Sequence, residues 1–128
     1  MAGLNGIGFF EIGTDRPAAA ERFYGEVFGW TFADDGGSKN ADGTAYRMVT
    51  TPDADGLRGG MFTTGGGVPN YAVFMVLVAD TAETCRRAVA AGGRVVFGPT
   101  TEPGGTTFAH LIDPSGAQIG VLTPPAAD

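Results

Sequence analysis

The two halves of the sequence repeat one order of predicted elements, and this repeat limits the possible fold more than any other feature. Each half reads as strand, helix, strand, strand, strand. Two aspartates near the helix starts, Asp15 and Asp80, lie about half of the 128-residue chain apart. An internal duplication is the simplest explanation. Because a half of roughly 60 residues would bury little surface alone, we expect both halves to pack into one domain.

Glycine marks the ends of these elements. The chain has 22 glycines, well above the usual share of about 7%, and many of them form doublets between apolar runs. Such doublets are typical of tight turns, so the strands and helices are predicted to be short. The segment 65–70, which contains three consecutive glycines and Pro69, is predicted to link the halves.

In the first half, an apolar run predicts a strand over 7–13, with Glu11 in it. Thr14 or Asp15 could cap the following helix, because both side chains accept hydrogen bonds from free backbone amides. Apolar residues then recur every four positions, which predicts a helix with one apolar face that ends at Gly29. The acidic segment 34–43 is expected to form a solvated loop or a flap. Three further strands are predicted over 30–33, 46–50 and 57–63.

The second half contains clearer boundary signals. Asp80 and Glu83 have the spacing of a capping box, in which each side chain can bond the other residue's backbone amide. Cys85 lies on the apolar face of the predicted helix and is interpreted as a buried small hydrophobe. The segment Asp113-Pro114-Ser115-Gly116 is typical of a turn between two strands. The strands of this half are predicted over 72–78, 94–97, 106–112 and 117–122.

Composition excludes several classes of function. The net charge of −6 and the lack of a basic cluster argue against nucleic acid as a partner. The longest apolar run, 71–79, is about half of the ~20 residues that a membrane-spanning helix needs. The N-terminus shows no secretory signal, so a cytoplasmic location is expected. A single lysine, Lys39, together with abundant alanine and glycine is typical of a GC-rich bacterial genome.

Several of these features together resemble the vicinal-oxygen-chelate superfamily, which includes glyoxalases, extradiol dioxygenases, and fosfomycin- and bleomycin-resistance proteins. They are the repeated element order, Glu11 in the first strand, Phe23-Tyr24 followed by Phe28-Gly29-Trp30, and the segment 113–117. The resemblance implies an α+β fold of two tandem βαβββ modules, whose curved mixed sheets surround a cleft, and a homodimer. On this basis, residues 1–128 form one domain, with module one at about 5–64, the link at 65–70 and module two at about 71–123.

Metalloenzymes of this superfamily carry His or Gln in the first strand of each module, and Glu or His in the last. The resemblance therefore allows a test for a divalent metal. No cofactor is expected, because the matching positions lack imidazole and carboxylate groups. A two-histidine site could form only between subunits, with the chain's one histidine, His110, donated by each. The matching positions are Phe9 or Gly8, Ala72 or Val73, Gly120, and the segment 57–63.

Two polar residues are candidates for chemistry. Glu11 lies between aromatic and aliphatic neighbours, where a carboxylate could act as a general base or anchor a ligand. The alternative is a structural role, in which Glu11 pairs with an arginine such as Arg47 or Arg58, or with backbone amides at a sheet edge. His110 lies in a predicted strand, where it is either a hydrogen-bonded core residue or a catalytic acid. If Glu11 and His110 faced one cavity, they could serve as base and acid.

Aromatic residues and methionines from separate strands could line a pocket for a flat, apolar ligand, although core packing is the alternative for most of them. The favoured function is a metal-independent protein that binds an aromatic or apolar antibiotic or metabolite, as in antibiotic resistance. The main alternative is a family enzyme (a glyoxalase-like lyase, isomerase or dioxygenase) that uses a metal or acid–base chemistry at Glu11. A third is an interaction module with an empty cleft. The candidate ligand-binding residues are Phe9, Glu11, Trp30, Tyr46, Met61, Phe74, Phe108 and His110.

Overall fold

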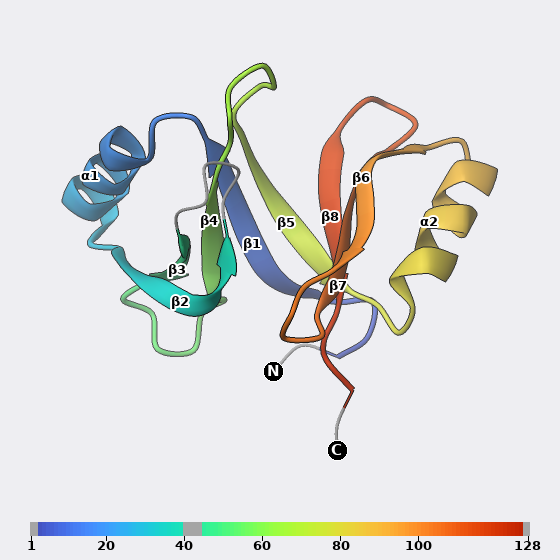
Figure 1. Cartoon of the computed structure of the whole chain (residues 1–128), viewed down its shortest axis with the longest axis horizontal. Helices are drawn as coiled ribbons and strands as arrows, with labels where there is room; N and C mark the ends of the chain where they lie inside the picture. The colour runs from blue at the N-terminus through green and yellow to red at the C-terminus, as the bar shows by residue number, and fades with distance from the viewer. Residues whose placement is uncertain (1–2, 40–44, 127–128) are drawn as a thin grey trace. The chain divides into compact units, whose positions relative to one another are not determined.

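The computed structural model describes residues 3–39 and 45–126, which contain eight strands and two helices (Figure 1). The predicted order of strand, helix and three strands occurs twice, so the α+β fold class is confirmed. The first set is β1 (Ile7–Thr14), α1 (Pro17–Phe28), β2 (Thr31–Lys39), β3 (Ala45–Thr50) and β4 (Gly59–Thr63). The second set is β5 (Tyr71–Leu77), α2 (Thr81–Ala90), β6 (Arg94–Thr101), β7 (Thr107–Ile112) and β8 (Gln118–Thr123).

The chain divides into two compact units, which are described separately. The N-terminal unit is Phe9–Ala72, and the C-terminal unit combines Val73 onward with the residues up to Gly8. Backbone hydrogen bonds explain why the first residues belong to the C-terminal unit. The amide of Asn5 donates to the carbonyl of Leu77 over 2.6 Å, and the amide of Leu77 donates to the carbonyl of Gly6 over 2.9 Å.

In the N-terminal unit, the strand order is β2-β3-β4-β1, with β1 and β4 parallel and the other pairs antiparallel. Helix α1 lies against one face of these strands (Figure 1). Ile12, Val49 and Met61 form the buried core on this face, joined by Tyr24 of α1 and by other partly buried rings. The apolar face of α1 is only partly covered. Phe23 and Val27 each remain 55% exposed.

In the C-terminal unit, the strand order is β5-β8-β7-β6, with β5 and β8 parallel and the remaining pairs antiparallel. Helix α2 packs on β6, β7 and β8 (Figure 1). The core contains Val78, Cys85, Ala109, Leu111 and Val121. Burial of Cys85 confirms its interpretation as a packed side chain, and the same burial raises the pKa of its thiol.

The two helices begin differently. Asp80 caps α2 as predicted, since its carboxylate accepts a hydrogen bond from the Glu83 amide over 3.0 Å. The predicted cap of α1 by Thr14 or Asp15 is wrong. Arg16 occupies that position, and no side chain of the described residues caps the helix. Thr14 is still part of β1, so it does not occupy the cap position. Its hydroxyl accepts a hydrogen bond from the Arg16 amide over 2.9 Å.

Of two loops predicted from the sequence, one is present and the other is largely replaced by a strand. The turn at Asp113 forms as predicted: its Oδ1 accepts from the Ser115 hydroxyl over 2.6 Å and from the amides of Ser115 and Ala117. These hydrogen bonds lower the pKa of Asp113, the Ser115 hydroxyl most of all. The expected loop over 34–43 is wrong for residues 34–39, which continue β2, and residues 40–44 lie outside the described part of the chain.

Candidate functional site

Glu11 lies in the middle of β1, on the strand face opposite α1. Its neighbours Phe10 and Ile12 pack into the core beneath the helix, and successive strand side chains point to opposite faces. Glu11 is nevertheless only 7% exposed. A carboxylate withdrawn from water to this degree is costly unless hydrogen-bond donors stabilise it. The surroundings of Glu11 therefore have to supply donors.

Two tyrosine hydroxyls supply them. The Tyr46 hydroxyl, on β3, donates to Oε1 of Glu11 over 2.8 Å, and the Tyr71 hydroxyl, at the start of β5, donates to Oε2 over 2.5 Å. Each carboxylate oxygen thus accepts a hydrogen bond from a tyrosine hydroxyl. Burial, followed by the charge and hydrogen bond of Glu11, raises the pKa of Tyr71 far above its ordinary value. Tyr71 therefore keeps its proton at neutral pH and remains a donor.

Two glycines make room for these rings. Gly60 on β4 lies beside Glu11 in the parallel register, and a Cβ atom at Gly60 would overlap the Tyr46 hydroxyl. A Cβ atom at Gly13 would likewise overlap the Tyr71 ring. Glycine inside a strand weakens it, and commonly marks a place where another group approaches the backbone closely. Here the approaching groups are the two rings that reach the Glu11 carboxylate.

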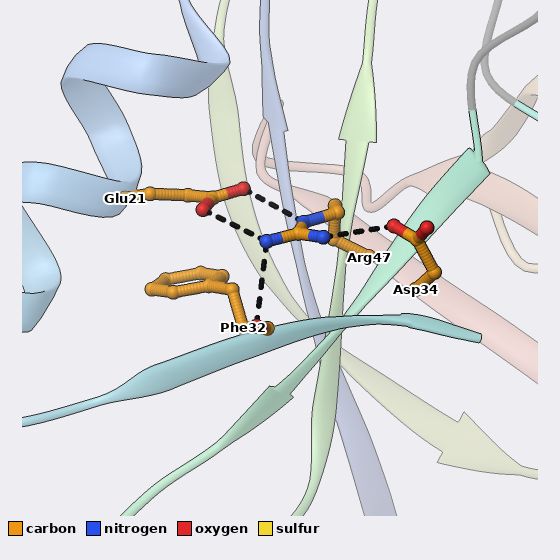
Figure 2. A network of polar contacts seen from close by, with 4 residues as sticks. All are labelled: Glu21, Phe32, Asp34 and Arg47. Carbon is orange, nitrogen blue, oxygen red and sulfur yellow. Dashed lines mark hydrogen bonds and ion pairs between the residues drawn. The ribbon is translucent and has the colours of Figure 1, made fainter.

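Arg47 is not the partner of Glu11. Figure 2 shows its guanidinium between Glu21 of α1 and Asp34 of β2. It donates to both Glu21 oxygens, over 2.9 and 3.1 Å, to Asp34 over 2.8 Å, and to the Phe32 carbonyl over 3.3 Å. These hydrogen bonds, first that with Glu21, raise the pKa of Arg47. Arg47 therefore ties α1 to the strands, and the suggested pairing of Arg47 with Glu11 is wrong.

His110 lies on β7 in the C-terminal unit and is 4% exposed. Its Nδ1 is 3.0 Å from the side-chain amide nitrogen of Gln118. Because an amide nitrogen can only donate, Nδ1 is the acceptor in this contact. The rings of Phe97 and Phe108 approach the imidazole at steep angles, with centroids 6.4 Å away in both cases.

The other candidate residues differ in burial. Trp30 stacks on Tyr24 with ring centroids 5.0 Å apart, and Met61 is fully buried, so both lie in the core beneath α1. Phe9 is partly buried on β1, and Phe74 is 44% exposed on β5. The structure brings Glu11 together with Tyr46 in the N-terminal unit, and Phe108 together with His110 in the C-terminal unit.

Sequence reasoning missed Tyr71 and Phe97. The alternation of Tyr71 with Val73 and Met75 was a usable signal, because Val73 and Met75 are both buried and the same period places Tyr71 on their face. For Phe97 no comparable signal exists, because the pairing register of β6 with β7 shifts on both sides of it.

With this geometry known, comparison with other proteins is informative. A profile of the Glyoxalase/Bleomycin resistance protein/Dioxygenase superfamily matches residues 6–121, so the chain belongs to this superfamily, as the sequence motifs predicted. Within it, the chain is 38% identical over 114 residues to "Putative glyoxylase CFP32" of Mycobacterium tuberculosis, covering 89% of this chain and 42% of that protein. It is 36% identical over 127 residues to "Anthracycline biosynthesis protein DauV" of Streptomyces sp., covering 95% of this chain and 44% of that protein. The chain thus spans less than half the length of these relatives.

Solved structures agree on the fold. The methylmalonyl-CoA epimerase of Mycobacterium tuberculosis matches with a TM-score of 0.61 and 16% identity, over 98% of this chain and 93% of that one. A methylmalonyl-CoA epimerase in complex with methylmalonyl-CoA and NH4+ matches with a TM-score of 0.60 and 19% identity, over 98% of this chain and 99% of that one. At these identities the likeness concerns the fold alone.

The positions that the resemblance assigns to metal ligands do not fit a divalent metal here. They are Phe9 or Gly8, Ala72 or Val73, Gly120 and the segment 57–63, all without imidazole or carboxylate groups. Across residues 3–39 and 45–126, no three His, Cys, Asp or Glu side chains lie close enough to hold a metal ion. Neither α1 nor α2 has the length and hydropathy of a membrane span.

Proposed function

We propose that this chain binds a flat aromatic or otherwise apolar small molecule without using a metal, and that the tyrosine–carboxylate cluster (Glu11, Tyr46 and Tyr71) orients the ligand. The observation that carries this proposal is a buried carboxylate held by two tyrosine hydroxyls from two other strands. Small-molecule sites are mostly apolar and contain a few convergent polar groups that fix orientation. The cluster is a set of this kind.

The chemistry of the cluster favours a ligand with hydrogen-bond donors. A tyrosine hydroxyl that donates its proton to Glu11 can still accept a hydrogen bond through its own oxygen. The phenolic oxygens of Tyr46 and Tyr71 lie beside the negative charge of the carboxylate. Ligand hydroxyl or amino groups would be bound well, while apolar burial at about 25 cal/mol/Å² would supply most of the affinity.

Similarity to a protein named for anthracycline biosynthesis supports the choice of ligand class, because anthracyclines are flat aromatic molecules that carry hydroxyl groups. Sequestration of such an antibiotic or of a related metabolite is the simplest activity for a site without metal ligands. We further propose a cytoplasmic homodimer as the working form. Both points are open to direct measurement.

The test is an equilibrium titration of the purified chain with an anthracycline, followed by the fluorescence of the ligand. Glu11→Gln, which removes the charge and retains the shape, should weaken binding about tenfold, a loss typical of a well-placed polar anchor. Tyr24→Phe is the matched control, because Tyr24 stacks on Trp30 in the core beneath α1. If the natural chain does not bind the anthracycline, or if both variants bind it equally well, the proposal is wrong.

The second candidate is an enzyme that uses acid–base chemistry, favoured by the 2.5 Å hydrogen bond between Tyr71 and Glu11. A carboxylate that shares a short hydrogen bond with a phenol is placed to take up and return a proton. Loss of turnover in Glu11→Gln with ligand binding intact would favour this function over sequestration. Native mass spectrometry of protein from a metal-supplemented host checks both proposals, since one bound divalent metal per site would overturn the metal-independent mode. The same spectrum reports whether the chain is a dimer.

A further inference from the structure

Phe97 on β6 is a large apolar side chain that remains 51% exposed beside two other rings. We infer that Phe97 and Phe108, braced by the buried ring of His110, form an aromatic platform on which a planar, polycyclic aromatic ligand stacks. This inference rests on the proposed function, because it assumes that the chain binds such a ligand. It gives the C-terminal unit a stacking surface of its own, on which Phe97 determines which ligands fit.

The rings of the platform support one another. Phe97 and Phe108 have centroids 5.7 Å apart and planes inclined by 32°. The imidazole of His110 stands at 73° to Phe97 and 84° to Phe108, so it approaches both rings edge to face. Offset and edge-to-face contacts of this kind are favourable and fix ring orientation. Phe97 is thus held from one side while half of its surface stays open to solvent.

The backbone next to Phe97 is shaped to place the ring. The pairing of β6 with β7 shifts between Phe97, which pairs with His110, and Thr100, which pairs with Phe108. Gly98 lies inside this irregularity with φ of +85°, and a Cβ atom there would meet the carbonyl oxygen of Phe108 at 2.7 Å. Bulges of this type redirect a side chain and are common beside functional sites.

The contacts of His110 show on which side of the sheet the platform lies. The Gln118 amide donates a hydrogen bond to Nδ1 of His110 and holds the imidazole in place. On β7 the residues on either side of His110, Ala109 and Leu111, face the core beneath α2. His110 therefore faces the other way, onto the side of the sheet where its ring meets Phe97. A phenylalanine ring that is half exposed and held by neighbouring rings suits a fused-ring ligand such as a quinone or phenol.

The test is isothermal titration with an uncharged dihydroxyanthraquinone, chosen because a chain with a net charge of −6 attracts cationic probes non-specifically. Phe97→Ala should weaken binding about tenfold, equivalent to ~1.4 kcal/mol. Phe97→Tyr keeps the ring and should bind within about twofold of the natural chain. Val89→Ala is the matched control, because Val89 is 57% exposed and lies on α2, which packs on the face of β7 opposite His110.

The outcomes separate this inference from the proposed function. If the natural chain binds and Glu11→Gln weakens binding while Phe97→Ala does not, the platform is wrong and the proposed function stands. If the chain binds an anthracycline but not the dihydroxyanthraquinone, the inferred ligand class is wrong. If it binds neither, both proposals fail. Should Phe97→Ala lose its native circular dichroism, weaker binding in a folded Phe97→Leu variant supports the platform, and unchanged binding in that variant overturns it.

Discussion

Removal of the Tyr71 hydroxyl tests the tyrosine–carboxylate cluster most directly. Tyr71→Phe keeps the ring over Gly13 and deletes the donor that lies 2.5 Å from Glu11. A hydrogen bond to a charged group contributes ~1.5–3 kcal/mol. Because Glu11 is only 7% exposed, water is poorly placed to replace the missing donor, so we expect a loss of stability of ~2 kcal/mol.

Urea unfolding at neutral pH measures this loss. With an m value of ~1–3 kcal/mol/M, the unfolding midpoint should fall by about 1 M while m stays unchanged. Tyr24→Phe is the control and should change stability by less than ~0.5 kcal/mol, since the stacked ring is retained. Equal effects of the two variants would mean that the Tyr71 hydroxyl contributes nothing specific.

A double-mutant cycle identifies the partner. Glu11→Gln, Tyr71→Phe and the double variant should give an interaction energy of ~1–2 kcal/mol, because the two groups are in direct contact. If the two single effects simply add, the Tyr71 hydroxyl does not stabilise the fold through Glu11 and the reasoning is refuted.

Three further predictions follow from described contacts. Above the ordinary tyrosine pKa of 10.0, the unfolded chain loses the Tyr71 proton while the folded chain keeps it, so stability should fall as pH rises. Urea unfolding across alkaline pH should show this slope in the natural chain and less of it in Tyr71→Phe; identical slopes would contradict the raised pKa. Gly60→Ala should destabilise the fold by ~1–3 kcal/mol, because the new methyl group displaces the Tyr46 ring, and unchanged thermal unfolding would show that the ring has room to move. Arg47→Met should cost only about 1 kcal/mol in urea unfolding, because the ion pair with Glu21 is partly exposed, and high salt should reduce the difference; a salt-independent loss would point to packing.

Much of the fold could be predicted from the sequence where neighbouring residues decide the conformation. Asp80 caps α2, and Asp113 closes its turn, because each carboxylate reaches amides two to four residues along the chain. The start of α1 was harder, because Thr14, Asp15 and Arg16 are adjacent and several are suitable caps. The helix start depends on how far β1 extends, and β1 reaches Thr14, which pairs with Thr63 of β4. Because this is a tertiary contact, the residues around the helix start do not reveal it.

The candidate site was only half predictable for a related reason. Glu11 could be identified because a carboxylate stands out in an apolar strand, and Tyr46 was among the aromatic candidates. Tyr71 became its partner through the position of its ring over Gly13, which no local pattern encodes. Arg47 was a reasonable partner by charge, but strand alternation puts it and Tyr46 on opposite faces of β3.

The position of Tyr71 has a consequence for anyone who divides this protein into pieces. The glycine-rich segment 65–70 looks like a natural place to split the chain for reassembly, because its residues are exposed. A cut there would leave Glu11 and Tyr46 on one fragment and Tyr71 on the other, although the three side chains share two hydrogen bonds. A break after Ala72, where the N-terminal unit ends, keeps all three on the same fragment but cuts β5 in two. Split versions for complementation assays should therefore avoid the whole stretch from the glycines to the end of β5.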